Sequence, residues 1–191
     1  MSFDLPTGIN SQDQMLWCIG VAARLDTAVE ASLRDMGRFL AHGMDLPAEM
    51  SDIWGGIGSK RGLLTELELR LAGDSRVSDE QRTKWGSILG RADAAHLERN
   101  RLIHDDWWPS VLNASGHPAL WHRQRRAKAD GTPYPSENFR TLDSFLECAH
   151  TLDDVLLDVV GQFQSTAMSV DREGYDTWWT DFNERRRGWK R

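Results

Sequence analysis

The sequence predicts an all-α protein: an antiparallel bundle of four to five helices, with an irregular loop or small hairpin inserted before the last long helix. Three observations lead to this prediction. Apolar residues recur at three- and four-residue steps over several long segments, Ser or Thr stands where these segments begin, and glycines and prolines interrupt the pattern over 113–138. At 191 residues the chain can bury one sizeable core, so residues 1–191 are expected to form a single domain.

The first helix is expected to run from Ser11 to His42. One acidic residue, Asp26, interrupts its apolar repeat, and because Leu25 can fill that place we expect Asp26 to face solvent. So long an amphipathic helix needs a partner helix or a second subunit along much of its length. The apolar stripe consists of Met15, Ile19, Ala22, Leu25, Val29, Leu33, Met36 and Leu40.

Two helices are expected to follow. The shorter one covers about Ser59 to Ala72. The second begins at Ser78, where Gln81 three residues later completes a capping box. Pro109 is expected to end this helix, because proline cannot continue the backbone hydrogen bonding.

The stretch 113–138 predicts a loop or small hairpin, with Asp130–Gly131 as the turn between 121–128 and 132–139. Thr141 then caps the last long helix. Residues 174–191 are expected to form a short C-terminal helix, from about Gly174 to Arg186, and a basic tail.

Composition is typical of a soluble globular protein, with 40% hydrophobic and 27% charged residues. No apolar run approaches the roughly 20 residues needed to cross a bilayer, and the N-terminus lacks the pattern of a secretory signal. A cytoplasmic location without membrane contact is therefore expected. The two cysteines, Cys18 and Cys148, lie in predicted helices without a CxxC pair, which predicts reduced, buried thiols.

Charge is unevenly distributed along the chain. The net charge of −6 argues against nonspecific nucleic-acid binding by the whole surface. Two basic clusters could nevertheless follow a phosphate backbone, although solvated charge on a loop and a tail is the better explanation of each cluster alone. These clusters are Arg123, Arg125, Arg126 and Lys128, and Arg185, Arg186, Arg187, Lys190 and Arg191.

The most specific chemical pattern lies late in the third predicted helix. His96, Asn100 and His104 follow one another at four-residue steps, so they share a helix face, and Arg99 stands beside them. A guanidinium, an amide and an imidazole together can grip a phosphate and move a proton beside it. In the alternative, structural interpretation, Arg99 pairs with Glu98 or with an acid on a neighbouring helix, and His104 caps the helix C-terminus.

The pattern Arg-Asn-x-x-x-His near a helix end resembles the signature of the HEPN superfamily. These small all-α proteins include metal-independent ribonucleases of toxin–antitoxin, defence and RNA-processing systems. The resemblance covers six residues closely, Arg99 to His104, and the helical layout more loosely.

The resemblance implies a homodimer in which both motifs face one cleft and act on RNA. His104 would then be the general base or acid, Arg99 would clamp the phosphate, and Asn100 would organise the site. The 2′-hydroxyl of the RNA attacks in such enzymes, so no metal or cofactor is implied, and the products carry 2′,3′-cyclic phosphate ends. An antitoxin or another regulatory protein is a further partner that the resemblance implies.

Two acidic residues depart from what a nuclease site needs. Asp105 and Asp106 follow His104 directly, where they either repel an RNA backbone or hold the imidazole in one tautomer. Many HEPN toxins that pair with a nucleotidyltransferase have a tyrosine at the position of Asp106, so that subtype is disfavoured. The alternative function is therefore a non-catalytic HEPN-like helical module that binds RNA, a nucleotide or a partner protein.

Further candidates surround the motif. Arg123 to Lys128 would extend the RNA path, and Trp108 could stack on a base; otherwise Trp107 belongs to the core and Trp108 to a subunit contact. His96 and His104 are more than two helical turns apart, which is too far to share one ion, so no metal site is predicted.

Overall fold

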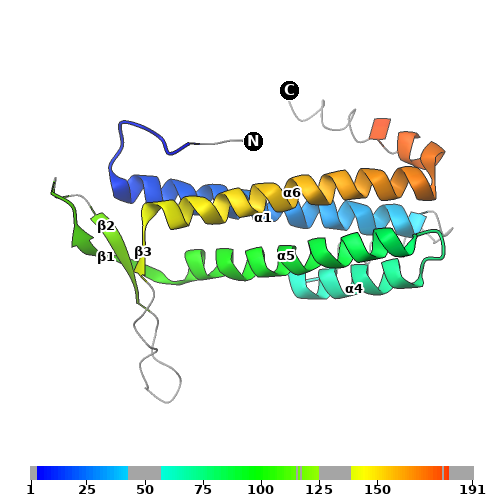
Figure 1. Cartoon of the computed structure of the whole chain (residues 1–191), viewed down its shortest axis with the longest axis horizontal. Helices are drawn as coiled ribbons and strands as arrows, with labels where there is room; N and C mark the ends of the chain where they lie inside the picture. The colour runs from blue at the N-terminus through cyan, green and yellow to red at the C-terminus, as the bar shows by residue number, and fades with distance from the viewer. Residues whose placement is uncertain are drawn as a thin grey trace, which may run out of the picture. The chain divides into compact units, whose positions relative to one another are not determined.

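The computed structural model describes residues 4–42, 57–114, 116, 118–124, 139–177 and 179–180. Within them the predicted fold class is confirmed: the protein is mostly helical, its helices pack as a bundle, and a small three-stranded antiparallel sheet precedes the last long helix (Figure 1). The elements in chain order are α1 (Ser11–His42), α4 (Lys60–Gly73), α5 (Asp79–His104), β1 (Asp106–Leu112), β2 (Pro118–Gln124), β3 (Phe139–Arg140) and α6 (Leu142–Val170).

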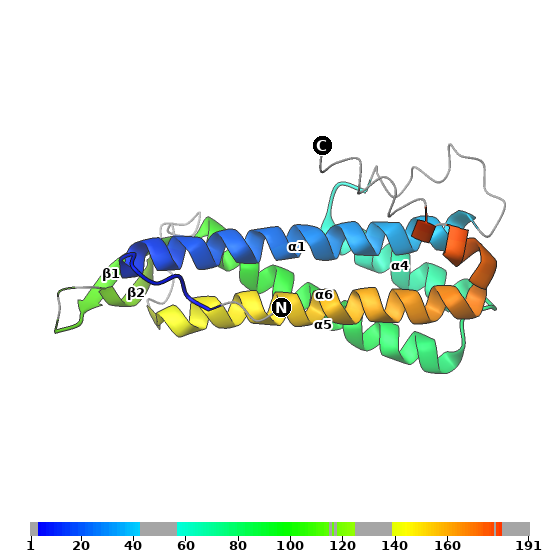
Figure 2. The same ribbon diagram turned by 90° about the horizontal axis from the view of Figure 1, so that it is seen from above.

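The chain divides into two compact units, and α1, α5 and α6 each contribute to both. The first, here the hairpin unit, comprises Met1–Ala28 and Ala94–Asp154. The second, here the α4 unit, comprises Val29–Asp93 and Val155–Arg191. Figures 1 and 2 show the sheet in the hairpin unit, next to the point where α5 ends and α6 begins.

Aromatic side chains hold the sheet of the hairpin unit against the start of α6. The strand order is β1-β2-β3, and both strand pairs are antiparallel. The rings of Trp107 and Trp121 pack edge-on against Phe145, with centroids 5.0 and 5.8 Å away. Trp107 also donates a hydrogen bond from Nε1 to the carbonyl of Leu102 at the end of α5. These contacts fix the direction in which the chain leaves the helix.

The predicted end of the third helix was wrong. The helix ends at His104 rather than before Pro109, and Pro109 lies inside strand β1. Because β1 is an edge strand, a proline that lacks an N–H need not break the ladder there. The packing of the half-buried Trp107 ring on Phe145 and its bond to Leu102 favour the strand over another helical turn.

The sheet also contains a hairpin that the sequence did not predict, formed by β1 and β2. Strands β1 and β2 meet across a turn in which Gly116 has φ +77°, a conformation that favours glycine. The predicted turn at Asp130–Gly131 lies outside the described residues. On either side of it, His122 pairs with Phe139, which agrees with the predicted pairing of the two segments.

In the α4 unit, aromatic and polar contacts join α1, α5 and α6. The ring of Phe39 on α1 meets those of Phe163 on α6 and of Tyr175 at centroid distances of 5.7 and 6.3 Å. Trp85 on α5 donates from Nε1 to Thr166 Oγ1 on α6 over 2.9 Å, in a fully buried position. Residues 172–177 and 179–180 are helical, as predicted, whereas the rest of the predicted C-terminal segment lies outside the described residues.

The predicted helix starts are confirmed by their caps. Ser59 Oγ accepts from the amide of Gly62, and Thr141 Oγ1 accepts from the amide of Ser144. Ser78 and Gln81 exchange side-chain to backbone hydrogen bonds, which is the reciprocal pattern of a capping box. Along the described residues, no helix is long and apolar enough to span a membrane.

Asp74, the residue that ends α4, generates a prediction about acid stability. It is buried, and the side-chain hydrogen bonds from Arg76 hold the pKa of its carboxyl below the usual value. A carboxyl whose pKa is depressed on folding stabilises the protein above its unfolded pKa, near 4, and this contribution disappears as the pH falls through the folded pKa.

We therefore expect Asp74→Asn to lower the free energy of unfolding by about 1–2 kcal/mol at pH 7, measured by urea unfolding. The difference from the wild type should shrink steadily below about pH 4. Glu80→Gln, which removes an exposed ion pair with Lys84, serves as the control and should change little. A difference that is the same at pH 7 and pH 3 would contradict the role given to Asp74.

Both cysteines are free and buried, as predicted, and burial raises the pKa of each thiol to about 11. Because the thiolate is the reactive form, iodoacetamide at pH 8 should label Cys18 and Cys148 very slowly in the folded protein and fully in urea. Ser165→Cys, at an exposed position of α6, provides a thiol that should react at once in both states. Rapid native labelling of the two natural cysteines would show that they are accessible.

Candidate functional site

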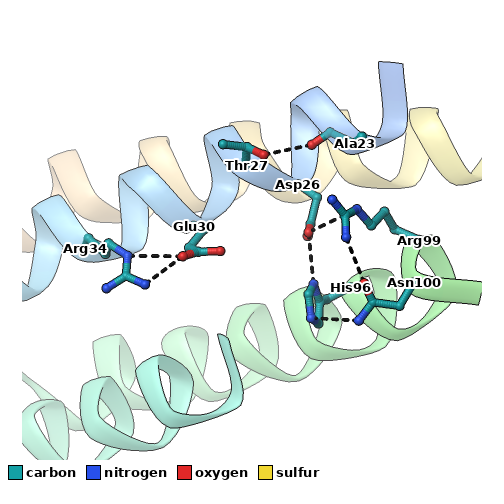
Figure 3. A network of polar contacts seen from close by, with 8 residues as sticks. All are labelled: Ala23, Asp26, Thr27, Glu30, Arg34, His96, Arg99 and Asn100. Atoms are coloured by element: carbon teal, nitrogen blue, oxygen red, sulfur yellow. Dashed lines mark hydrogen bonds and ion pairs between the residues drawn. The ribbon is translucent and has the colours of Figure 1, made fainter. Parts of the chain in front are cut away.

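Four polar side chains of the hairpin unit form one connected network (Figure 3). Asp26 Oδ2 on α1 lies 2.9 Å from His96 Nδ1 on α5, and His96 Nε2 lies 3.0 Å from Asn100 Nδ2. Arg99 Nη1 donates to Asn100 Oδ1 over 2.8 Å, and Arg99 Nε lies 3.6 Å from Asp26 Oδ2. The four side chains thus close a ring of polar contacts between two helices.

The position of Asp26 corrects the expectation that it faces solvent. Its relative exposure is 3%, whereas Leu25 is only half-buried. The buried stripe of α1 passes through Ala22, Asp26 and Val29, at steps of four and three residues, so the acid occupies a core position of the repeat. It is tolerated there because His96 and Arg99 on α5 supply a hydrogen bond and a positive charge.

The network contains only part of the predicted motif. Arg99 and Asn100 belong to it, and Arg99 pairs with an acid on a neighbouring helix, which is one of the two partners that the structural interpretation gave it. His104 is exposed in the last turn of α5 and, among the described residues, no hydrogen bond or ion pair joins it to the network. The motif thus separates into a half-buried arginine–asparagine pair and an exposed histidine.

Two residues of the network, Asp26 and His96, were not assigned to a site by the sequence. His96 was recognised as one member of the polar face, and it does face the same way as Asn100. The signal for Asp26 was the acidic residue inside an otherwise apolar repeat. Predicting that Asp26 is buried would have required knowledge of its cationic partner, and only the packing of α1 on α5 reveals that partner.

A second group of contacts ties the same stretch of α5 to the sheet. Glu98 forms an ion pair with Arg140 of β3, and the Arg140 guanidinium lies 5.7 Å from the ring centroid of Trp107. Burial lowers the pKa of Arg140. On α6, the Cys148 thiol lies within electrostatic range of both Asp26 and Arg99, although burial is the main cause of its raised pKa.

The remaining predicted site residues are only partly described. Asp105 is half-buried immediately after α5, and Trp108 is 59% exposed on β1. Asp106 and Arg123 lie in β1 and β2, but their side chains are not among those described. The other basic cluster residues lie outside the described part of the chain: Arg125, Arg126 and Lys128, and Arg185, Arg186, Arg187, Lys190 and Arg191.

Comparison with known proteins identifies no relative of this chain. No protein-family model, curated protein or solved structure is significantly similar to it. Within the described residues, no group of three or more His, Cys, Asp or Glu side chains is arranged to hold a metal ion. The chemistry of the site is therefore inferred from the network itself and from the exposed end of α5.

The burial of Asp26 predicts a large cost for replacing it. Asp26→Leu completes the apolar stripe but leaves Arg99 without its charge partner and His96 Nδ1 without its acceptor. We expect the free energy of unfolding to fall by about 2–4 kcal/mol, measured by urea unfolding. Glu30→Leu, one helical turn further along α1 at a partly exposed ion pair, is the control and should cost less than about 1 kcal/mol. An equal loss of unfolding free energy in the two variants would show that the network does not stabilise the protein.

Proposed function

We propose that this protein is a metal-independent endoribonuclease of HEPN type that acts as a homodimer. One observation carries the proposal: Arg99 is held by Asn100 and Asp26 near the end of α5, and an exposed histidine, His104, follows four residues after Asn100. A positioned guanidinium and a histidine open to solvent are the two groups that phosphodiester cleavage by the RNA itself requires.

The guanidinium of Arg99 suits a phosphate-binding role. It has five N–H donors. Nη1 donates to Asn100, and Nε lies 3.6 Å from Asp26 Oδ2, in an ion pair without a hydrogen bond. The donors of Nη2 can therefore bind phosphate oxygens, while the side chain is 21% exposed. Because its other contacts already fix the plane of the guanidinium, little conformational entropy is lost when a phosphate binds.

The reaction follows from these groups. The 2′-hydroxyl oxygen of a ribose attacks the adjacent phosphorus, and its proton passes to a histidine acting as general base. The bond from phosphorus to the 5′-oxygen breaks, and a histidine acting as general acid returns a proton to that oxygen. The products are a 2′,3′-cyclic phosphate and a 5′-hydroxyl. In the proposed dimer, two copies of His104 and Arg99 face one RNA strand, and the basic stretch from Arg123 to Lys128 extends its path.

The second candidate function is a non-catalytic helical module that binds RNA, a nucleotide or a partner protein. One observation favours it: the charge of Arg99 is already balanced by the buried carboxylate of Asp26, which weakens its attraction for a phosphate. An antitoxin or another regulatory protein would then bind the exposed end of α5 or the sheet beside it.

The proposal predicts RNA cleavage in excess EDTA by the purified wild type, with fragments that end in 2′,3′-cyclic phosphate. His104→Ala should reduce the rate at least about 100-fold, because it removes the general acid–base group, without changing the circular dichroism or the oligomeric state. His150→Ala, on α6 of the same unit, is the matched control and should retain activity if it stays folded.

Three results would count against the nuclease. Cleavage that stops when EDTA is added would contradict the metal-independent mechanism, and unchanged cleavage by His104→Ala would remove the proposed acid–base residue. Stable RNA binding without cleavage by the folded wild type would favour the binding module.

A further inference from the structure

The hydrogen bonds of the network have only one consistent direction. An arginine side chain can only donate, and an ionised carboxylate can only accept. Arg99 therefore requires the oxygen of the Asn100 amide on its side, which turns the amide NH₂ toward His96 Nε2. Nε2 must then accept, so the proton of the neutral ring is on Nδ1, which donates to Asp26.

This direction excludes two other states of His96 as long as the network is intact. A ring protonated on Nε2, either as the other neutral tautomer or as the cation, would point an N–H at the NH₂ group of Asn100. Turning the Asn100 amide over would relieve that clash but would point the NH₂ group at Arg99, which only donates. Changing the proton on His96 therefore breaks the contact between Asn100 and Arg99.

We infer that Asp26 and His96 are positioning residues that act through Asn100 to hold the Arg99 guanidinium in its binding orientation. Their place in the reaction rests on the proposed function. Asp26 selects the Nδ1–H tautomer of His96, this tautomer orients the Asn100 amide, and the amide oxygen holds Arg99. Both nitrogens of His96 are occupied in this chain, so the proton transfers of cleavage belong to the exposed His104.

The rival explanation is a purely structural ion pair between Asp26 and Arg99, beside which His96 only fills space. It predicts that charge matters and that the tautomer does not. Two substitutions separate these explanations. Asp26→Asn keeps the shape of Asp26, and Asn100→Asp changes the hydrogen-bond direction at Asn100. Only the positioning explanation expects the ring protons of His96 to change in these variants.

The first measurement reads the histidine ring nitrogens directly in ¹H–¹⁵N correlation spectra of the full-length chain, with His96 assigned by comparison with His96→Gln. Free histidine in water prefers the Nε2–H tautomer, so we expect the wild type to show the opposite, Nδ1–H form at His96 between pH 7 and 8. Asp26→Asn replaces the carboxylate by an amide, whose neutral oxygen is a weaker acceptor for Nδ1–H, and should raise the population of the Nε2–H tautomer. Glu30→Gln, the same chemical change one turn further along α1, should leave His96 unchanged.

A second variant replaces the donor that faces His96 Nε2 by an acceptor, and its effect is measured without RNA. In Asn100→Asp, a carboxylate oxygen replaces the NH₂ group opposite Nε2, so both ring nitrogens face acceptors. An N–H on each ring nitrogen then satisfies both acceptors, so the spectra should show His96 with N–H signals at Nδ1 and Nε2. This variant also tests the inference if Asp26→Asn does not fold.

The activity measurement separates positioning from fold stability. With folded protein, Asp26→Asn should lower kcat for RNA cleavage by about 10- to 100-fold with a smaller change in KM, and Glu30→Gln should match the wild type. An Nε2–H tautomer in the wild type would overturn the inference, and so would wild-type kcat in Asp26→Asn.

Failure of the inference and failure of the proposed function remain distinguishable. A wild type that cleaves no RNA overturns the nuclease, and with it the catalytic role of the chain of contacts. The ring-nitrogen spectra still decide in that case whether Asp26 and His96 set the orientation of Asn100.

Discussion

The buried carboxylate of Asp26 is the constraint on which the rest of the hairpin unit depends. A charge at a core position of α1 is costly unless donors surround it, so the facing stretch of α5 must present polar groups where an ordinary bundle would place leucines. His96 and Arg99 meet that demand, and they thereby set which side of α5 turns toward α1. Asn100 follows one helical turn after His96 and closes the ring of contacts.

The sheet extends this arrangement beyond the end of the helix. Strand β1 begins two residues after His104, and Trp107, its Nε1 bonded to the Leu102 carbonyl, packs on Phe145. The ion pair between Glu98 and Arg140 ties the same turn of α5 to β3. The α5 residues of the network, the exposed histidine and the start of β1 therefore lie within residues 96–107.

Two histidines of similar chemistry thus lie in different environments. His96 is about one-fifth exposed and has both ring nitrogens engaged, so its ring proton is held in a hydrogen bond of the network. His104 is exposed, and its ring can exchange protons with solvent or substrate. The hydrogen bonds distinguish the two histidines, because an imidazole with both ring nitrogens engaged cannot change its protonation state without breaking the bonds around it. The proposed nuclease uses the first histidine for orientation and the second for proton transfer.

Local pattern was sufficient to predict the helices. The repeat of α1, the capping box at Ser78 and the cap at Thr141 are properties of neighbouring residues, so α1 was predicted with the bounds that it has. The shared face of His96 and Asn100 was also predictable, because residues four apart lie on one side of a helix. The end of α5 and the burial of Asp26 were decided only by tertiary structure. Trp107 leaves the helix because Phe145 of α6 offers it a surface, and Asp26 is buried because α5 brings it a cation. Neither partner is near in sequence, so no local pattern contains this information.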